Sequence, residues 1–233
     1  MCKKLAVLIS AVLFVSCPLF AVINDHFDDG VLDSAWQVTY ENTTSWNYTE
    51  SGSLLTCSAI PRINNNVDSA VLLTRSFTAL GNFEVKSKIL WDNKGLDSSR
   101  GWVETRLYSG NTLVAWGGYC DWWIFHSGMK EARINPSSLY YYDSGIDTMP
   151  YSGNAEFTMT RTDGNINIMW NGQVFLSGYS NLPIDTIGLY FHNLSYYPGE
   201  SFGTMSFDYV TAVPEPITMI LLAMGCLLTR RKQ

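Results

Sequence analysis

Acidic residues are the first place to look for chemistry, because two carboxylates on one face of a strand can serve as acid and base. Alternate residues of a strand share a face, so such a pair would stand two or four residues apart. Retaining hydrolysis of a glycoside needs two carboxylates about 5 Å apart. In this sequence Glu84 is followed by Lys86 and Lys88, and Glu104 is followed by Arg106. Cations stand where the second carboxylate would be, so we predict that the chain is not an enzyme.

The other residue types that carry chemistry lead to the same prediction. His26, His126 and His192 are far apart and lack the spacing of zinc ligands. The sequence has neither a Gly-x-Ser-x-Gly elbow nor a glycine-rich phosphate loop. A Ser/His/Asp site that the fold assembles from distant residues is the alternative left open.

A binding role has a candidate in the aromatic segment WGGYCDWWIFH, which starts at Trp116, and in the tyrosines at 140–142. The apolar face of a sugar ring stacks on indole and phenol rings, while nearby polar groups bind its hydroxyls. We predict that Trp123 and Tyr141 stack on a sugar and that Asp121 and His126 form hydrogen bonds with it. The alternative is that these aromatic residues fill a large core.

The elements that must position these residues are strands. The strongest pattern lies between residues 157 and 176, where three alternating runs are separated by Asp163-Gly164 and Asn171-Gly172. Asp-Gly and Asn-Gly tolerate the positive φ of tight hairpin turns, so we predict a three-stranded antiparallel meander. No window of a dozen residues between 22 and 212 has a helical period. The pattern predicts an all-β fold, a two-sheet antiparallel jelly-roll sandwich spanning residues 22–212.

The N-terminal segment, residues 1–21, has the order of a secretory signal. Lys3 and Lys4 precede the apolar stretch Leu5–Val15, and small and turn-forming residues follow. We predict a signal helix that is cleaved after Ala21. The alternative is a lipoprotein signal, because Phe14-Val15-Ser16-Cys17 is similar to a lipobox with Cys17 as the lipidated residue.

The C-terminal segment, residues 213–233, has three parts. Pro214-Glu215-Pro216 is stiff, Ile217–Thr229 is apolar and uncharged, and Arg230, Arg231 and Lys232 follow. An apolar run that ends in cations is typical of a membrane segment with its basic end in the cytoplasm. We predict a transmembrane helix here, close to the minimum spanning length of about 17 residues.

Composition narrows the class of partner. The formal net charge is −6, the isoelectric point is about 5.0 and the sequence has no basic patch. These features argue against nucleic acid as a binding partner. Between the terminal segments only Cys57 and Cys120 remain. In an oxidising compartment they either form a disulfide or stay as buried thiols.

The C-terminal segment resembles the PEP-CTERM sorting tail of exported bacterial proteins, through Pro214, Glu215 and Pro216, the hydrophobic helix and the cations Arg230 and Arg231. This resemblance implies anchoring in the inner membrane and then processing by an exosortase near the Pro-Glu-Pro motif. The protein would then reach the cell envelope, the cell surface or the extracellular space of a bacterium that makes extracellular polysaccharide.

The mature chain resembles the concanavalin-A-like (laminin-G-like) sandwich domains. The resemblance rests on the segments at 27–33, at 81–85 and at 207–210, together with Trp36. It implies a domain related to carbohydrate, in a family that includes both glycosidases and binding modules. Many members of such families hold a structural Ca²⁺ between the first and last strands, so we predict Asp28 and Asp208 as ligands. Turns also collect aspartate without metal, which is the alternative.

Together these observations predict an exported surface or matrix protein that binds carbohydrate or a matrix polymer without catalysis. The alternatives are a structural surface protein without a ligand and a secreted polysaccharide hydrolase.

Overall fold

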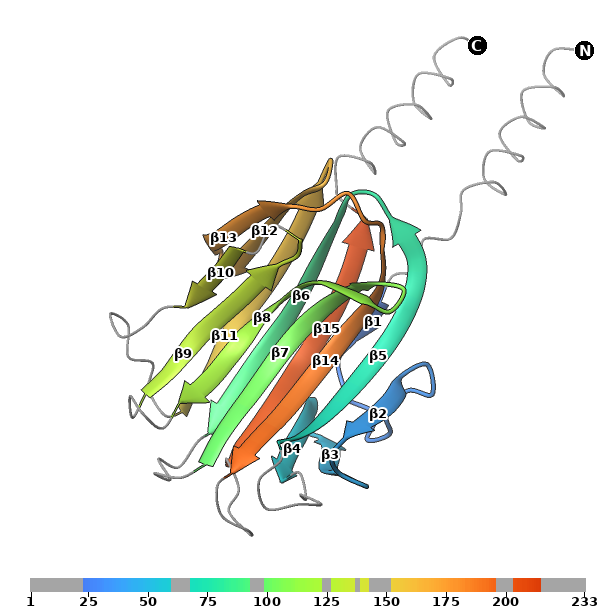
Figure 1. Cartoon of the computed structure of the whole chain (residues 1–233). Helices are drawn as coiled ribbons and strands as arrows, with labels where there is room; N and C mark the ends of the chain where they lie inside the picture. Colours follow the sequence, from blue (N-terminus) through green and yellow to red (C-terminus); the bar gives the residue numbers. More distant parts are fainter. Residues whose placement is uncertain are drawn as a thin grey trace, which may run out of the picture.

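The computed structural model describes residues 23–59, 68–92, 99–122, 127–136, 139–142, 152–195 and 203–214. This part of the chain forms two antiparallel sheets that stack face to face (Figure 1). The predicted signal helix lies outside the described residues, and so does the predicted transmembrane helix after Pro214. Within the described residues no helix is long and apolar enough to cross a membrane.

The first sheet has eight strands and runs in the order β13-β12-β11-β6-β15-β4-β3, with β1 also paired to β15. Its strands are β1 (Ile23–Asp25), β3 (Asn47–Ser51), β4 (Leu54–Ala59), β6 (Phe83–Asp92), β11 (Ser152–Thr162), β12 (Asn165–Trp170), β13 (Gln173–Tyr179) and β15 (Thr204–Pro214). The first strand described starts at Ile23 and the last ends at Pro214, and the predicted domain bounds of 22–212 stay a prediction.

The second sheet has seven strands in the order β10-β9-β8-β7-β14-β5-β2. These are β2 (Gln37–Glu41), β5 (Ser69–Leu80), β7 (Ser99–Ser109), β8 (Thr112–Trp122), β9 (Ser127–Ile134), β10 (Leu139–Tyr142) and β14 (Ile184–Ser195). The all-β prediction and the two-sheet jelly-roll sandwich are confirmed for the described residues.

The predicted meander is confirmed as β11, β12 and β13. Antiparallel pairing joins Phe157 to Trp170 across the first turn and Ile168 to Leu176 across the second. Asp163 and Asn171 have φ of 50° and 48°, and the glycine after each is also positive. These are the conformations that Asp-Gly and Asn-Gly allow in two-residue hairpins.

The core lies between the sheets and is built by residue alternation. Along β6 every second side chain is buried, and the buried set includes Phe83, Val85, Ile89 and Trp91. Trp91 stacks on Tyr119 of the opposite sheet with ring centroids 4.4 Å apart. Of the aromatic residues in the segment that starts at Trp116, Tyr119 is fully buried, so the alternative that these residues fill the core is confirmed for Tyr119. Four tryptophans from other segments also lie in the core, namely Trp36, Trp46, Trp91 and Trp170. Cys57 and Cys120 are both buried and no disulfide joins them, which agrees with the alternative of buried thiols.

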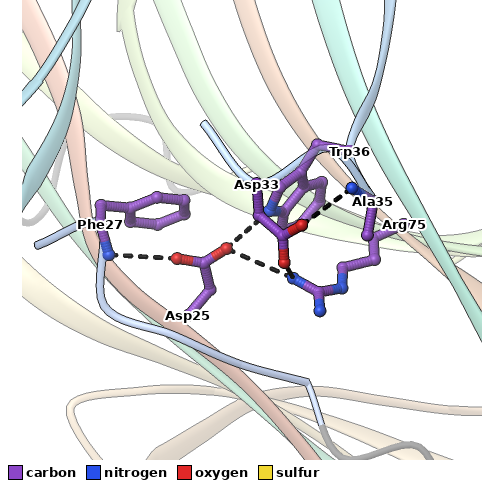
Figure 2. A network of polar contacts seen from close by, with 6 residues as sticks. All are labelled: Asp25, Phe27, Asp33, Ala35, Trp36 and Arg75. Atoms are coloured by element: carbon purple, nitrogen blue, oxygen red, sulfur yellow. Dashed lines mark hydrogen bonds and ion pairs between the residues drawn. The ribbon is translucent and has the colours of Figure 1, made fainter. Parts of the chain in front are cut away.

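A polar clamp ties the first strand to the second sheet (Figure 2). Asp25 of β1 accepts hydrogen bonds from Trp36 Nε1 at 2.7 Å and from Phe27 N at 3.1 Å. Arg75 of β5 reaches Asp25 at 3.4 Å and Asp33 at 2.9 Å. The Asp25 side chain is only 13% exposed, so its contacts are partly shielded from water. The clamp fixes the segment between β1 and β2 across the edge of the sandwich.

Loss of the Asp25 carboxylate is expected to destabilise the fold. Asp25→Ala would leave the indole N–H of Trp36 without its acceptor and Arg75 with one carboxylate. Because hydrogen bonds to charged groups contribute about 1.5–3 kcal/mol, we expect the free energy of unfolding to fall by about 2 kcal/mol in urea denaturation. Asp33→Ala removes a carboxylate that is 44% exposed and should cost at most about 1 kcal/mol. Equal effects of the two substitutions would contradict this account of the clamp.

Candidate functional site

The four residues predicted to bind sugar fall in parts of the chain whose side chains the structure does not describe. Trp123 and His126 lie outside the described residues. Asp121 and Tyr141 have described backbones, paired with Gly128 and Ala132 in the second sheet. Their role in binding stays a prediction.

The two predicted calcium ligands lie in different settings. Asp28 is exposed and lines an acidic pocket of about 590 Å³ together with Asp25, Asp29 and Asp33. Asp208 does not line this pocket; it stands at an irregularity of β15 and pairs with Lys88 Nζ at 2.6 Å. Among the described residues no three His, Cys, Asp or Glu side chains are grouped as a metal would require. Calcium binding by Asp28 and Asp208 stays a prediction.

A buried carboxyl group lies next to this acidic turn. Glu50 of β3 is 9% exposed, and its Oε2 atom has no hydrogen-bond partner among the described residues. Burial raises the pKa of Glu50 to about 7, helped by the hydrogen bond and charge of Asp29. The pKa of Asp29 is lowered instead, first by the hydrogen bond from Val31 N and then by the one from Glu50. Glu50 therefore holds the proton of this carboxyl pair.

A second pair of acidic side chains lies on the outward face of the second sheet, the face turned away from the core. Glu104 of β7 pairs with Gly118 of β8, and Gly118 pairs with Glu131 of β9. Residues in register on three neighbouring strands project to the same face, and each interstrand step is about 4.8 Å. The register therefore places both glutamates on one face, on either side of a residue without a side chain.

Gly118 is required by the backbone at this point. A Cβ built on Gly118 would overlap the carbonyl oxygen of Val103 and lie 2.8 Å from Cα of Glu104. A larger residue would push β7 and β8 apart. Because the two strands approach so closely, the position between the two glutamates carries no side chain.

Glu104 is buried and paired with a cation. Its residue is 4% exposed, and its Oε2 accepts a hydrogen bond from Arg106 Nε at 2.8 Å. Burial is the main cause that raises the pKa of Glu104, and the negative charge of Glu131 raises it further. Arg106 opposes both effects, and the net direction is upward.

Glu131 has a different environment. It is 8% exposed, and its Oε2 accepts a hydrogen bond from Trp102 Nε1 at 3.2 Å. The two glutamates therefore have different surroundings, because Glu104 contacts a cation and Glu131 accepts a hydrogen bond from an indole.

Aromatic residues surround the pair. The Arg106 guanidinium lies over the ring of Tyr190 at 3.2 Å from its centroid, and Tyr190 is 7% exposed. The Trp102 ring contacts His192 with centroids 4.5 Å apart, and His192 Nε2 is 3.4 Å from Asp68 Oδ2. We call Glu104, Gly118, Glu131, Trp102, Arg106 and Tyr190 the carboxylate site.

No family model matches the chain, and no curated protein matches it. Solved structures share the fold. One comes from work on endo-acting O-glycanases that human gut bacteria express to initiate mucin breakdown; it has 14% identity, a TM-score of 0.58 and coverage of 82% of this chain and 98% of that one. A family 16 endo-glucanase from Bacteroides ovatus has 12% identity, a TM-score of 0.55 and coverage of 82% and 99%. The CBM2 module of the evolved Dit protein of Lactobacillus casei phage J-1 has 12% identity, a TM-score of 0.58 and coverage of 82% and 95%.

These findings correct the prediction that the chain is not an enzyme, and with it the prediction of a non-catalytic binding module. The solved structures that share its fold are mostly glycoside hydrolases. Acids paired along one strand are visible in the sequence, whereas Glu104 and Glu131 come from two strands separated by a third. In the sequence, Gly117-Gly118 marks a place where strands approach closely. Only the pairing of β7, β8 and β9 shows that Glu104 and Glu131 flank it.

The proton held by Glu50 makes stability depend on pH. Because its folded pKa of about 7 lies above the ordinary value of 4.5, the folded chain binds the proton more tightly than the unfolded chain. This contribution to stability is complete below about pH 4.5 and is lost as the pH rises through 7. Glu50→Gln should remove that part of the pH dependence in urea unfolding between pH 4.5 and 8. Asp28→Asn, next to Asp29 in the neighbouring acidic turn, should leave it in place, and an unchanged profile in Glu50→Gln would contradict the assignment.

Proposed function

We propose that this protein is a polysaccharide hydrolase whose reaction is carried out by Glu104 and Glu131. The observation that carries the proposal is the placement of two buried carboxyl groups on the outward face of a jelly-roll sheet, separated by Gly118. Two carboxyl groups that flank a glycosidic bond are what most glycoside hydrolases use. The mucin-directed O-glycanases and the endo-glucanase with the same fold support the substrate class.

Glu104 is proposed as the general acid. Burial raises its pKa, which keeps a proton available for the oxygen of the leaving sugar. Proton donation leaves a carboxylate, and Arg106 Nε already lies 2.8 Å from it. The contact of Arg106 with the Tyr190 ring holds the guanidinium in place during the proton transfer. Arg106 thus stabilises the product state of the proton transfer.

Glu131 is proposed as the base. The hydrogen bond from Trp102 Nε1 orients its carboxylate. A whole strand lies between β7 and β9, so the two backbones are about 10 Å apart. This spacing leaves room for a water molecule between the carboxyl groups, which is the arrangement of inverting enzymes. We therefore expect Glu131 to activate water rather than to form a covalent intermediate.

Hydrolysis is expected to depend on both glutamates. Glu104→Gln and Glu131→Gln should each lower the release of reducing ends from a panel of bacterial, plant and mucin polysaccharides by about 100-fold or more. Glu84→Gln is the matched control, because Glu84 pairs with Lys86 at 3.1 Å on the first sheet, away from the site. NMR of the fresh product should show an inverted anomeric configuration.

Absence of turnover on the whole panel would contradict the proposed function. Equal rates in Glu104→Gln and Glu84→Gln would also contradict it, because the activity would then lie elsewhere. A retained configuration would overturn only the role of Glu131 as base.

We also propose that the chain is exported and processed by an exosortase, as the order of its two terminal segments supports. In a bacterium that has an exosortase, mass spectrometry of the mature protein should find a chain that begins after the signal segment and ends near Pro214-Glu215-Pro216. Deletion of the exosortase gene should leave residues 217–233 attached in the membrane fraction. A mature protein that keeps Arg230 and Arg231 in the presence of the enzyme would contradict processing.

A further inference from the structure

One row of residues lies directly beside the two glutamates, and two of its three members, Trp116 and Arg133, have no role in the proposed reaction step. Two residues from the glutamates along their strands, Arg106 pairs with Trp116, and Trp116 pairs with Arg133. Two residues along a strand span about 7 Å, so this row is parallel to the row of the glutamates and next to it. A polymer held over the glutamates and lying along β8 would cross it.

Trp116 is the centre of this row and projects outward. Its neighbours on β8 project inward, because Ala115 is fully buried in the core and a Cβ on Gly117 would overlap the Phe157 ring. The Trp116 side chain is half-buried, which leaves part of it accessible on the face that carries the glutamates. An indole in this position offers an apolar surface to a sugar ring next to the one being cleaved.

Arg133 differs from the other arginines whose side chains the structure describes. Arg75 and Arg106 are paired with carboxylates, and Arg161 donates to backbone carbonyl oxygens. Arg133 is exposed and makes no hydrogen bond or ion pair with any described residue. It stands one interstrand step, about 4.8 Å, from Trp116.

Resting on the proposed function, we propose that Trp116 and Arg133 form a subsite for a sugar that carries an acidic group, so that the substrate is an anionic polysaccharide. The sugar ring stacks on Trp116, and its carboxylate or sulfate accepts hydrogen bonds from the guanidinium of Arg133. The planar guanidinium has the geometry to donate two hydrogen bonds to such an oxyanion. The row also brings positive charge beside the two glutamates, because Arg106 contacts Glu104 and Arg133 lies two residues from Glu131 on β9. An anionic chain can then approach the site.

The test measures binding without turnover. The full chain carrying Glu104→Gln is titrated with polygalacturonate and with its methyl ester, and with a sulfated galactan and its desulfated form. We expect at least one charged member to bind about tenfold more tightly than its neutral counterpart. Arg133→Gln should weaken that binding at least fivefold and change binding of the neutral member less than twofold. Trp116→Ala should weaken both members.

The control variant is Lys86→Gln, which removes the same charge from the first sheet, where Lys86 pairs with Glu84. Equal effects of Arg133→Gln and Lys86→Gln, equal binding of charged and neutral members, or no binding of any of the four polymers would overturn the subsite. Failure of the proposed function is distinct from this: charged polymer bound through Arg133 but never hydrolysed by the unmodified chain would contradict the hydrolase alone. Hydrolysis of a neutral polymer that Arg133→Gln leaves unchanged would contradict the subsite alone.

Discussion

Three strands of the second sheet must pair in a single register for the molecule to have both a closed core and its outward-facing carboxyl groups. Along β7 the inward residues Val103, Thr105 and Leu107 are fully buried, and Glu104 and Arg106 lie between them on the other face. Because side chains alternate with a period of two, a slip of one residue would bury both charges in the core. Thr105 secures the register from inside, since its hydroxyl bonds to Ser87 of the opposite sheet at 2.7 Å.

The outward faces of the two sheets show how the same residue types take different roles. On the first sheet Glu84 and Lys86 form a pair in which both side chains are about a third exposed. On the second sheet Glu104 and Arg106 have the same spacing and opposite charges, yet their side chains are 6% and 16% exposed. The first pair is solvated and contributes little. The second pair is largely buried, and this burial raises the pKa of Glu104.

Much of the fold could be predicted from the sequence because its signals are local. The Asp163-Gly164 and Asn171-Gly172 turns and the alternation along β6 each depend on a few consecutive residues. The carboxylate site could not be predicted in this way. Glu104 and Glu131 are brought together only by the pairing of β7 with β8 and of β8 with β9, and pairing of distant strands has no local signature. The local pattern Glu104-x-Arg106 even argued against catalysis, whereas in the structure Arg106 forms an ion pair with Glu104.

The pairing of β1 with β15 has a mechanical consequence. Ile23 faces Ala212, so both ends of the described chain leave the sandwich from the same end of one antiparallel ladder. A force that pulls these ends apart would break the hydrogen bonds of the ladder one at a time. The ladder resists such a force far less than a force along the strands, which would have to break all of these hydrogen bonds at once. β1 has only three residues, and its removal would take Asp25 away from Arg75. A pulling force on a molecule held at both ends would therefore detach β1 from β15 first, while β7, β8 and β9 in the other sheet stay paired.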